Sequence, residues 1–230
     1  MISVLMTAYK GEFYIEEALR SVLAQLSFDD EIIVCEEKPG SPVGRIISRL
    51  AAEDSRIIHV EGKSLGTTDS IVTAIRHCRG DKIYLCSQSD VWLPDKIKRV
   101  SELFDKGADM VIHNAYITDE ALNITEHSYF VTHNVTKSTI KDVMSPGCVP
   151  SLMAFDRKML RYIMPIPKHI PLYDQWIRVI CHIYGRVRLL DAPLIYYRED
   201  TPKEEADKKE LRSRRRYLLS KVYKRVFFKR

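Results

Sequence analysis

The chain has 230 residues, of which 45% are hydrophobic and 29% charged, a composition ordinary for a soluble globular protein with one sizeable core. No run approaches the ~18 uninterrupted apolar residues of a membrane span, so we expect no transmembrane helix. The net charge of +5 is unevenly placed: residues 203–230 contain 12 Lys/Arg against 4 Asp/Glu, a balance of +8, which leaves −3 for the rest of the chain.

The five cysteines favour a reducing, cytoplasmic setting. They are odd in number, form no C-x-x-C pair, and three of them lie within apolar strand or helix patterns. We therefore expect reduced and buried thiols. The chain starts MISVLMTAYKGE, directly as a strand and without a basic leader, so we expect no signal peptide.

Strand and helix patterns alternate along the first half of the chain. Compact apolar runs predict strands at 2–8, 31–36, 56–62, 82–86 and 110–117. Apolar residues at helical spacing predict helices at 15–22, 44–52, 66–78 and 94–104. A repeat of about 25 residues favours βαβ units on a right-handed parallel sheet.

Beyond residue 118 the alternation weakens. The patterns there predict a strand at 152–156, a helix at 172–185 that ends at Gly185, and one broken or two short strands at 187–197.

Three polar segments follow predicted strands: TAYKGE after the first, EEKPGS after the second and SQSD after the fourth. Open α/β sheets bind ligands beyond the carboxyl ends of their strands, so a site is expected here. The first strand end has neither G-x-G-x-x-G nor G-x-x-x-x-G-K-[ST], which argues against dinucleotide and P-loop nucleotide binding. Tyr9 can stack on a base or merely pack beside the first helix. The pair Glu36 and Glu37 can accept from ribose or a base, or be solvated loop charges.

Six ordered blocks carry a family resemblance: SVLMTAYKGEFYIEEALRSVLAQ, EIIVCEEKPGS, RGDKIYLCSQSDVWLPDKI, SPGCVPSLMAFDRKML, LYDQWI and PLIYYRED. In this order and spacing they resemble family 2 glycosyltransferases of the GT-A fold, over residues 1–200. The resemblance implies an α/β fold, with a GT-A-like (Rossmann-like), mostly parallel sheet flanked by helices. A basic, amphipathic helical tail would follow at 201–230. It also implies transfer of a sugar from a nucleotide diphosphate sugar to an acceptor hydroxyl, usually with inversion, in building a bacterial-type surface glycan.

The resemblance also assigns site residues. It implies nucleotide-sugar binding by residues at the strand ends and in the last block: Thr7, Ala8, Tyr9, Glu36, Glu37, Ser87, Ser89, Asp90 and Arg198. Asp174 matches the family's general base, which would take the proton of the acceptor hydroxyl, although by itself an aspartate there reads as a helix cap.

A pocket for the sugar or the acceptor involves four further residues. Gly147 and Cys148 match a turn that approaches the sugar or acceptor in the family. Trp92 and Trp176 flank the two sites in sequence, where each can wall a sugar pocket or, as is more usual for tryptophan, belong to the core.

The chain departs from the family's D-x-D-D metal motif at its first and third positions, which are Ser87 and Ser89. Serine hydroxyls bind Mg²⁺ or Mn²⁺ far more weakly than carboxylates do, so we predict no firmly held metal. Asp90 and Asp200 are weak candidates for holding such a cation beside the diphosphate. Otherwise fixed cations must stabilise the departing charge, and the candidates are Arg198, Lys10 and Lys96.

Two other functions stay open. The missing carboxylates also suit a degenerate sugar-nucleotide-binding or scaffold protein that keeps the fold without catalysis. A nucleotidyltransferase is disfavoured, because no glycine-rich phosphate loop bearing Lys or Arg follows the first strand.

The tail suggests a further partner. Residues 211–230 contain nine Lys/Arg and no acid, with apolar residues near one helical face: Leu211, Leu218, Leu219, Val222 and Val226. This favours an interfacial helix on an anionic membrane, attracted by about 1 kcal/mol per basic residue, and suits a lipid-linked acceptor at the inner face of the plasma membrane. A helix packed on the catalytic domain is the second interpretation. Nucleic acid is a distant third, so none is expected as a partner.

Overall fold

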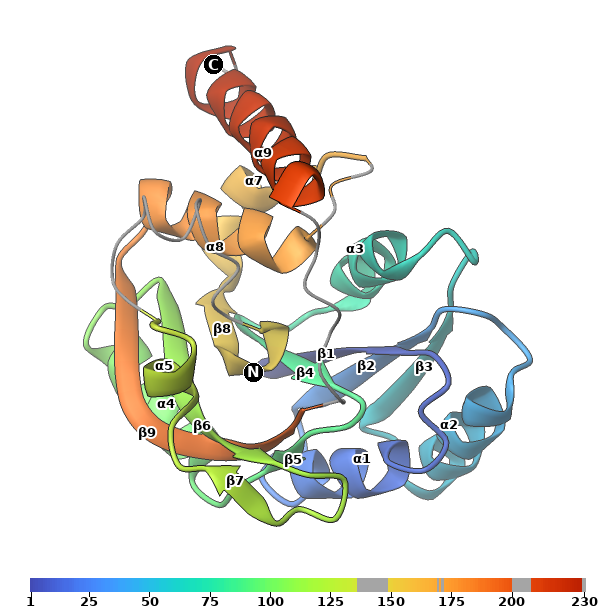
Figure 1. Cartoon of the computed structure of the whole chain (residues 1–230). Coiled ribbons are helices and arrows are strands. Elements are labelled where there is room, and N and C mark those ends of the chain that lie inside the picture. The colour runs from blue at the N-terminus through green and yellow to red at the C-terminus, as the bar shows by residue number, and fades with distance from the viewer. Residues whose placement is uncertain (136–148, 169, 171, 200–207, 229–230) are drawn as a thin grey trace.

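The parallel strands of the first half of the chain build one side of the molecule. The structure is a computed structural model that describes the chain except residues 136–148, 169, 171, 200–207 and 229–230. Within the described part, the strands form one nine-stranded sheet in the order β3-β2-β1-β4-β8-β6-β9-β5, with β7 paired to β6 (Figure 1). Strand bounds are β1 Ile2–Ala8, β2 Glu31–Glu36, β3 Ile57–Glu61, β4 Lys82–Ser87, β5 Val91–Trp92, β6 Met110–Thr118, β7 Ile124–Glu126, β8 Met153–Asp156 and β9 Val187–Arg198.

Strands β1 to β4 are parallel, as the alternating pattern predicts, and their register aligns the polar segments that follow them. Ala8 pairs with Glu36 across β1 and β2, and Thr7 pairs with Ser87 across β1 and β4. The three segments that we singled out in the sequence therefore leave the sheet at one edge.

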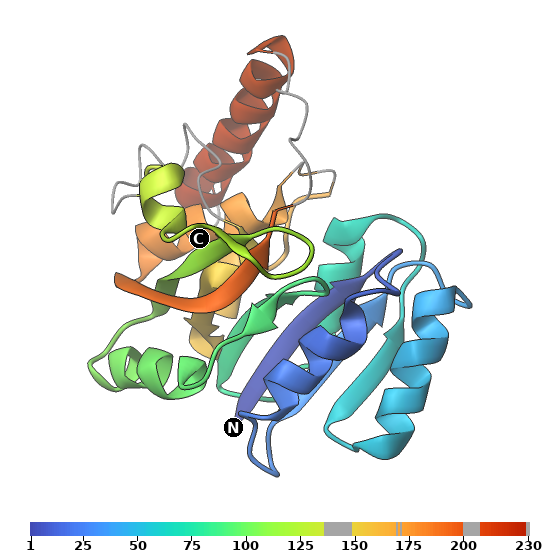
Figure 2. The same ribbon diagram turned by 60° about the horizontal axis from the view of Figure 1, so that its bottom comes forward.

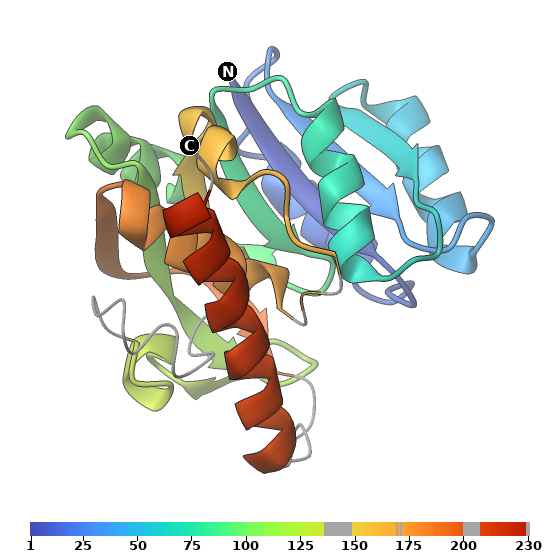
Figure 3. The same ribbon diagram turned by 90° about the horizontal axis from the view of Figure 1, so that it is seen from above.

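Helices cover both faces of this parallel part. Figures 2 and 3 show α1 (Ile15–Leu23) and α2 (Pro42–Glu53) on one face and α3 (Thr67–His77) on the other. Every residue of β2 is buried as a result, which is why that strand reads as a continuous apolar run between two glutamates.

The second half of the sheet is mixed rather than parallel. Strand β8 runs antiparallel to both β4 and β6, and β5 runs antiparallel to β9, whereas β6 and β9 pair in parallel. The predicted fold class is confirmed, with the parallel character concentrated in β1 to β4. Residues 187–197, predicted as one broken or two short strands, lie in one continuous strand. Its pairing with β6 is irregular, with register shifts on either side of Asn114.

Among the described residues, three of the remaining helices fall where the sequence predicts them, and two one-turn helices were not predicted. Their bounds are α4 Lys96–Asp105, α5 Tyr129–Thr132, α7 Leu160–Ile163, α8 Tyr173–Tyr184 and α9 Lys208–Phe228, with 3₁₀ turns at Pro150–Leu152 and Arg157–Met159. Helix α4 begins two residues later than predicted, because Asp95 has a left-handed backbone with φ of 64°. Helix α8 ends at Gly185, as expected.

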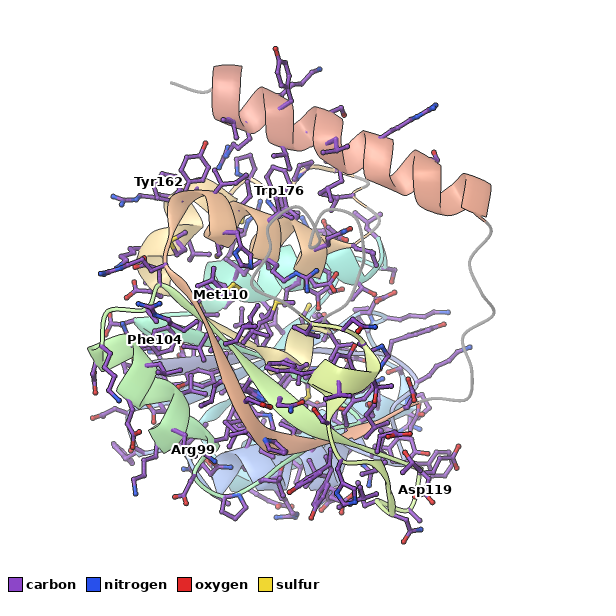
Figure 4. The ribbon with its side chains drawn as sticks, turned by 60° about the vertical axis from the view of Figure 1, so that its left-hand side comes forward. Arg99, Phe104, Met110, Asp119, Tyr162 and Trp176 are labelled. Carbon is purple, nitrogen blue, oxygen red and sulfur yellow. The ribbon has the colours of Figure 1, made fainter. Side chains whose placement is uncertain are left out.

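The basic helix α9 packs on the body over its second half (Figure 4). Leu218 is buried there, Tyr217 Oη donates to Lys168 O at 2.6 Å, and Arg225 Nε donates to Tyr162 O at 2.9 Å. Leu218 and Val222, which we expected on a membrane-facing stripe, instead join the protein core or pack against it. In the described residues, no helix is long and apolar enough to cross a membrane.

Candidate active site

The ends of β1 and β4 are joined by one side chain that the sequence patterns did not single out. Gln88 Nε2 donates to Tyr9 O at 2.7 Å, and Tyr9 N donates to Gln88 Oε1 at 2.9 Å. A Cβ on Gly11 would lie 2.3 Å from the Gln88 side chain, so the amide could not keep this hydrogen-bonded position beside a larger residue. Thr7 is half-buried and Tyr9 is exposed at this rim, where its ring is accessible for stacking.

The two glutamates at the end of β2 have different environments. Glu36 is 2% exposed and accepts hydrogen bonds from Ser41 N at 2.8 Å and Ser41 Oγ at 2.7 Å, while its other oxygen contacts His59 Nε2 at 3.0 Å. These contacts hold the loop that leads into α2, where Ser41 is the N-cap. Glu37 is half-exposed and accepts from Thr67 Oγ1 at 3.1 Å. Glu36 therefore serves the fold, and Glu37 is the accessible carboxylate.

The turn at residues 87–90 is held by an arginine. Ser87 Oγ and Ser89 Oγ lie 3.0 Å apart, and Arg198 Nη1 donates to Ser89 O at 2.7 Å. Arg198 Nη2 also donates to Glu17 Oε2 at 2.6 Å, and its guanidinium lies 4.7 Å from the centre of the Tyr14 ring. Arg198 is buried and paired with a carboxylate, so our expectation that it supplies a free cation for the diphosphate is wrong. It positions the turn instead.

Two buried titratable side chains lie behind this turn. Asp90 is fully buried and Lys96 is 1% exposed, with Lys96 Nζ donating to Ser151 O at 3.0 Å and lying 3.9 Å from the centre of the Trp92 ring. Burial raises the pKa of Asp90 to about 6, and the nearby Ser151 hydroxyl and the Lys96 and Arg198 cations act in the opposite direction. Burial lowers the pKa of Lys96 to about 7. The Lys96 amine is thus buried inside the protein, withdrawn from the diphosphate that we expected it to meet.

The residues present do not fit a divalent cation. Beside a diphosphate, Mg²⁺ or Mn²⁺ is held by one or two accessible carboxylates together with the phosphates of the substrate. The turn offers the hydroxyls of Ser87 and Ser89 and one carboxylate, Asp90, that is fully buried. Throughout the described part of the chain, no group of three or more His, Cys, Asp or Glu is arranged to hold a metal. Asp200 lies outside the described residues.

Asp174 lies in the first turn of α8 and is half-buried. Leu172 holds the N-cap position, so Asp174 is not the helix cap that the sequence alone favoured. The segment before it reaches the start of α3, where Thr68 Oγ1 donates to Ile170 O at 3.4 Å. Because α3 begins just beyond β3, this contact brings the start of α8 toward the edge where the parallel strands end. The positive end of the helix dipole favours an ionised Asp174.

Both tryptophans belong to the core, which corrects their assignment to a sugar pocket. Trp176 is 1% exposed and donates from Nε1 to Ile163 O at 2.9 Å, and Trp92 is 3% exposed and contacts Tyr84. The Trp176 ring contributes packing, and Trp92 lines a cavity with Ser21 of α1 and Ile97 of α4 rather than the rim at the strand ends. Ala8 is also buried. Gly147 and Cys148 lie outside the described residues, and the other four cysteines are buried and free.

The family model described as glycosyl transferase family 2 matches residues 3–164. An uncharacterized glycosyltransferase of Nostoc sp. is 23% identical over 206 residues, which cover 86% of this chain and 64% of that protein. The chondroitin synthase of Escherichia coli is 26% identical over 123 residues, covering 54% of this chain and 18% of the synthase. The chain therefore spans less than two thirds of the length of these curated relatives.

Solved structures share the fold. Residues 1–349 of S. aureus TarS in complex with UDP-GlcNAc superpose with a TM-score of 0.75 at 14% identity, covering 96% of this chain and 66% of that one. The mannosyltransferase PcManGT from Pyrobaculum calidifontis, in complex with GDP-Man and Mn²⁺, gives a TM-score of 0.67 at 19% identity, with 97% and 64% covered. The matched residues run through all four parallel strands and the three segments at their ends. The chain belongs to glycosyl transferase family 2.

Proposed function

We propose that the chain transfers a sugar from a nucleotide diphosphate sugar to an acceptor hydroxyl in one displacement with inversion. The observation that carries this proposal is the joining of the segments after β1, β2 and β4 at one edge, through Gln88 and the strand register. Family membership and the likeness to structures that hold UDP-GlcNAc or GDP-Man support the same donor class.

In this mechanism Asp174 is the general base. Its carboxylate takes the proton of the acceptor hydroxyl while that oxygen forms a bond to the anomeric carbon. The bond from the anomeric carbon to the diphosphate breaks at the same time, and its electron pair leaves on the diphosphate oxygen. Tyr9 would stack on the base and Glu37 would accept from the nucleoside. Lys10, exposed beside Tyr9, is the predicted cation best placed to meet the departing charge.

The test begins with thermal-shift measurements on UDP-GlcNAc, GDP-Man and other nucleotide sugars, each with and without Mn²⁺, followed by turnover assays on any stabilising donor. Asp174→Asn should bind the donor like the parent protein and lose turnover by about 10²-fold or more. Asp95→Asn, at an exposed position before α4, is the matched control and should keep full turnover. NMR of the product then reports its anomeric configuration, and retention would refute a single displacement.

A second candidate is a sugar-nucleotide-binding or scaffold protein without catalysis. The observation that favours it is the replacement of two motif carboxylates by Ser87 and Ser89. Donor binding without turnover on any glycan or lipid-linked acceptor would support this candidate against transfer. Turnover that Asp174→Asn abolishes would exclude it.

We infer that the acceptor is a glycan, or a lipid-linked precursor of a polysaccharide at the inner face of the plasma membrane, and that α9 contributes to membrane contact through its charge. Its packed side is taken up by Leu218 and Val222, while Arg216, Leu219 and Lys224 are exposed. Each basic residue near an anionic surface adds about 1 kcal/mol.

Sedimentation with anionic vesicles tests this contact without deleting a helix that packs on the body. Arg216→Glu/Lys224→Glu should weaken the binding, and raising the salt concentration should do the same. Unchanged sedimentation of the double variant would end the membrane proposal. Glu102→Lys, on α4, is a control that changes charge elsewhere on the molecule.

A further inference from the structure

The segment after β1 contains a backbone conformation that its sequence does not favour. Lys10 has a φ of 51°, in the left-handed region that a residue with a Cβ adopts at a cost in free energy. Residues strained in this way persist where their neighbours determine the conformation, and they cluster at functional sites. Lys10 lies at the carboxyl edge of the sheet, directly after Tyr9, and both residues are exposed. Its conformation therefore needs a structural cause and suggests a use.

The structural cause is the amide of Gln88. It exchanges two hydrogen bonds with the backbone of Tyr9, donating to Tyr9 O at 2.7 Å and accepting from Tyr9 N at 2.9 Å. On the other side of Lys10, Gly11 O accepts from Tyr14 N at 3.1 Å, where the chain turns into α1. The backbone of Lys10 is thus fixed from both sides.

Gln88 is itself held in place by its neighbours in the 87–90 turn. Ser87 pairs with Thr7 across β4 and β1, and the carbonyl of Ser89 accepts from Arg198 Nη1 at 2.7 Å. A side chain on a fixed backbone that makes two hydrogen bonds can hold its partner closely. The turn whose two serines do not fit a divalent cation therefore holds the end of β1 through the residue between them.

The use that this arrangement suggests is the charge of Lys10. Its Nζ lies 5.3 Å from the centre of the Tyr9 ring, an exposed cation–π contact that is weak enough to leave the ammonium group available to an anion. The other cations that we expected to meet the diphosphate are enclosed: Arg198 pairs with Glu17 at 2.6 Å, and Lys96 is 1% exposed. Lysine binds a phosphate as a point charge on a flexible stem, so its contribution depends on where the backbone places that stem.

We propose that Gln88 is a positioning residue that sets the left-handed backbone of Lys10 and so presents its ammonium group to the diphosphate of the donor, in the place of a divalent cation. This inference rests on the proposed function, which supplies the donor class, and names the residue on which binding without a metal depends. It explains why the position between the two serines holds a side chain long enough to cross to the end of β1.

The test measures the binding of UDP, GDP, CDP, ADP and dTDP, and of the matching monophosphates, by calorimetry of the full chain in the presence of EDTA. In the parent protein at least one diphosphate should bind more tightly than its monophosphate. Gln88→Ala and Lys10→Met should each raise the dissociation constant of that diphosphate by about tenfold, and that of the monophosphate far less. Salt should weaken the diphosphate more in the parent than in either variant.

A double-mutant cycle separates positioning from direct contact with the ligand. If Gln88 acts through Lys10, Gln88→Ala/Lys10→Met should bind the diphosphate no more weakly than Lys10→Met alone. Losses that add would show that the two side chains act independently, and would overturn the proposal. Equal weakening of diphosphate and monophosphate in Gln88→Ala would overturn it too, because the amide would then serve the Tyr9 ring rather than the charge.

A second glutamine provides the matched control. Gln25, just beyond the C-terminal end of α1, donates to Leu93 O at 2.9 Å and accepts from Ile97 N at 3.3 Å. Gln25→Ala therefore removes the same kind of contact elsewhere and should leave the nucleotide affinities unchanged. Lys98→Met, which removes an exposed lysine on α4, should leave them unchanged as well.

Gly11→Ala gives a second route to the same loss, because its Cβ would displace the Gln88 amide while Gln88 and Lys10 stay in the sequence. It should weaken the diphosphate as Gln88→Ala does. Parent-like diphosphate affinity in both variants would overturn the inference and leave the proposed function intact. If no diphosphate binds the parent protein, the proposed donor class is wrong and the inference fails with it.

Discussion

At the scale of single residues, Gly11 and Gln88 form a matched pair. The space that a Cβ on Gly11 would need is filled by the Gln88 side chain, at 2.3 Å. We expect Gly11→Ala to destabilise the protein by about 0.5–1.5 kcal/mol, because it displaces the amide that exchanges two hydrogen bonds with Tyr9. In a Gln88→Ala background the same substitution should cost much less. Urea unfolding of the parent, the two single variants and the double variant measures these free energies. An equal loss of stability from Gly11→Ala in both backgrounds would contradict the pairing of Gly11 with Gln88.

His113 gives the protein a predictable dependence on pH. It is 1% exposed, and burial, aided by the Lys96 charge, holds its pKa well below the usual value. Below about pH 6.5 the unfolded chain therefore binds a proton that the native protein does not. As the pH is lowered through this range, the free energy of unfolding decreases by up to about 1.4 kcal/mol per pH unit.

The measurement is the free energy of unfolding between pH 7 and pH 5 for the parent protein and His113→Gln. The parent should lose more stability than the variant over this range. Asp90, whose pKa is raised to about 6, has the opposite effect, because the native protein takes up its proton first as the pH falls. That contribution is present in both proteins and cancels in their difference. Parallel curves would mean that His113 is not held neutral.

At the scale of the element, α9 is attached by a narrow set of side chains. Leu218 is 1% exposed and its neighbour Leu219 is 46% exposed, which makes a matched pair on one helix. We expect Leu218→Ala to cost about 2–4 kcal/mol through the cavity that it leaves. Leu219→Ala should change stability by about 0.5 kcal/mol or less. Chemical denaturation compares the two, and equal effects would mean that α9 does not dock through Leu218.

At the scale of the whole molecule, periodicity in the sequence was sufficient to predict the parallel half of the sheet. Residues 2–8, 31–36 and 82–86 are short apolar runs with helical patterns between them, and local pattern determines such βαβ units. The antiparallel insertion of β8 between β4 and β6 depends on pairing between distant segments, which no window of the sequence reports.

The candidate site was predictable in its position and less so in the roles of its residues. Strand ends locate the rim, and a polar residue such as Tyr9 or Glu37 stays accessible there. Burial decides which of two similar residues is structural and which is accessible to a ligand, as with Glu36 and Glu37. Burial in turn depends on neighbours in the tertiary structure. The same limit applies to Arg198 and Lys96, whose charges were expected to face the ligand and are instead enclosed.

Arg198 connects parts of the chain that are far apart in sequence, so its loss should affect the whole molecule. Its guanidinium joins Glu17 on α1, Ser89 in the turn and the carbonyl of Glu120 after β6. Arg198→Met would leave the two carbonyl acceptors unpaired, while the half-exposed Glu17 could turn to solvent, and we expect a loss of about 2–4 kcal/mol in unfolding free energy. Arg198→Lys should recover only part of it, because one ammonium group cannot reach three acceptors in the fork geometry of arginine.

Glu17→Gln separates the parts of this junction. It keeps an oxygen that can accept from Arg198 but leaves the charge of the buried guanidinium unmatched, so we expect it to cost about 1–3 kcal/mol. The affinity for the donor gives a second readout. It should fall more in Arg198→Lys than in Glu17→Gln, because only the first substitution weakens the contact that holds Ser89. Thermal unfolding compares Arg198→Met, Arg198→Lys and Glu17→Gln. Equal losses of stability in the three variants would mean that Arg198 contributes its ion pair with Glu17 and not the joining of three segments.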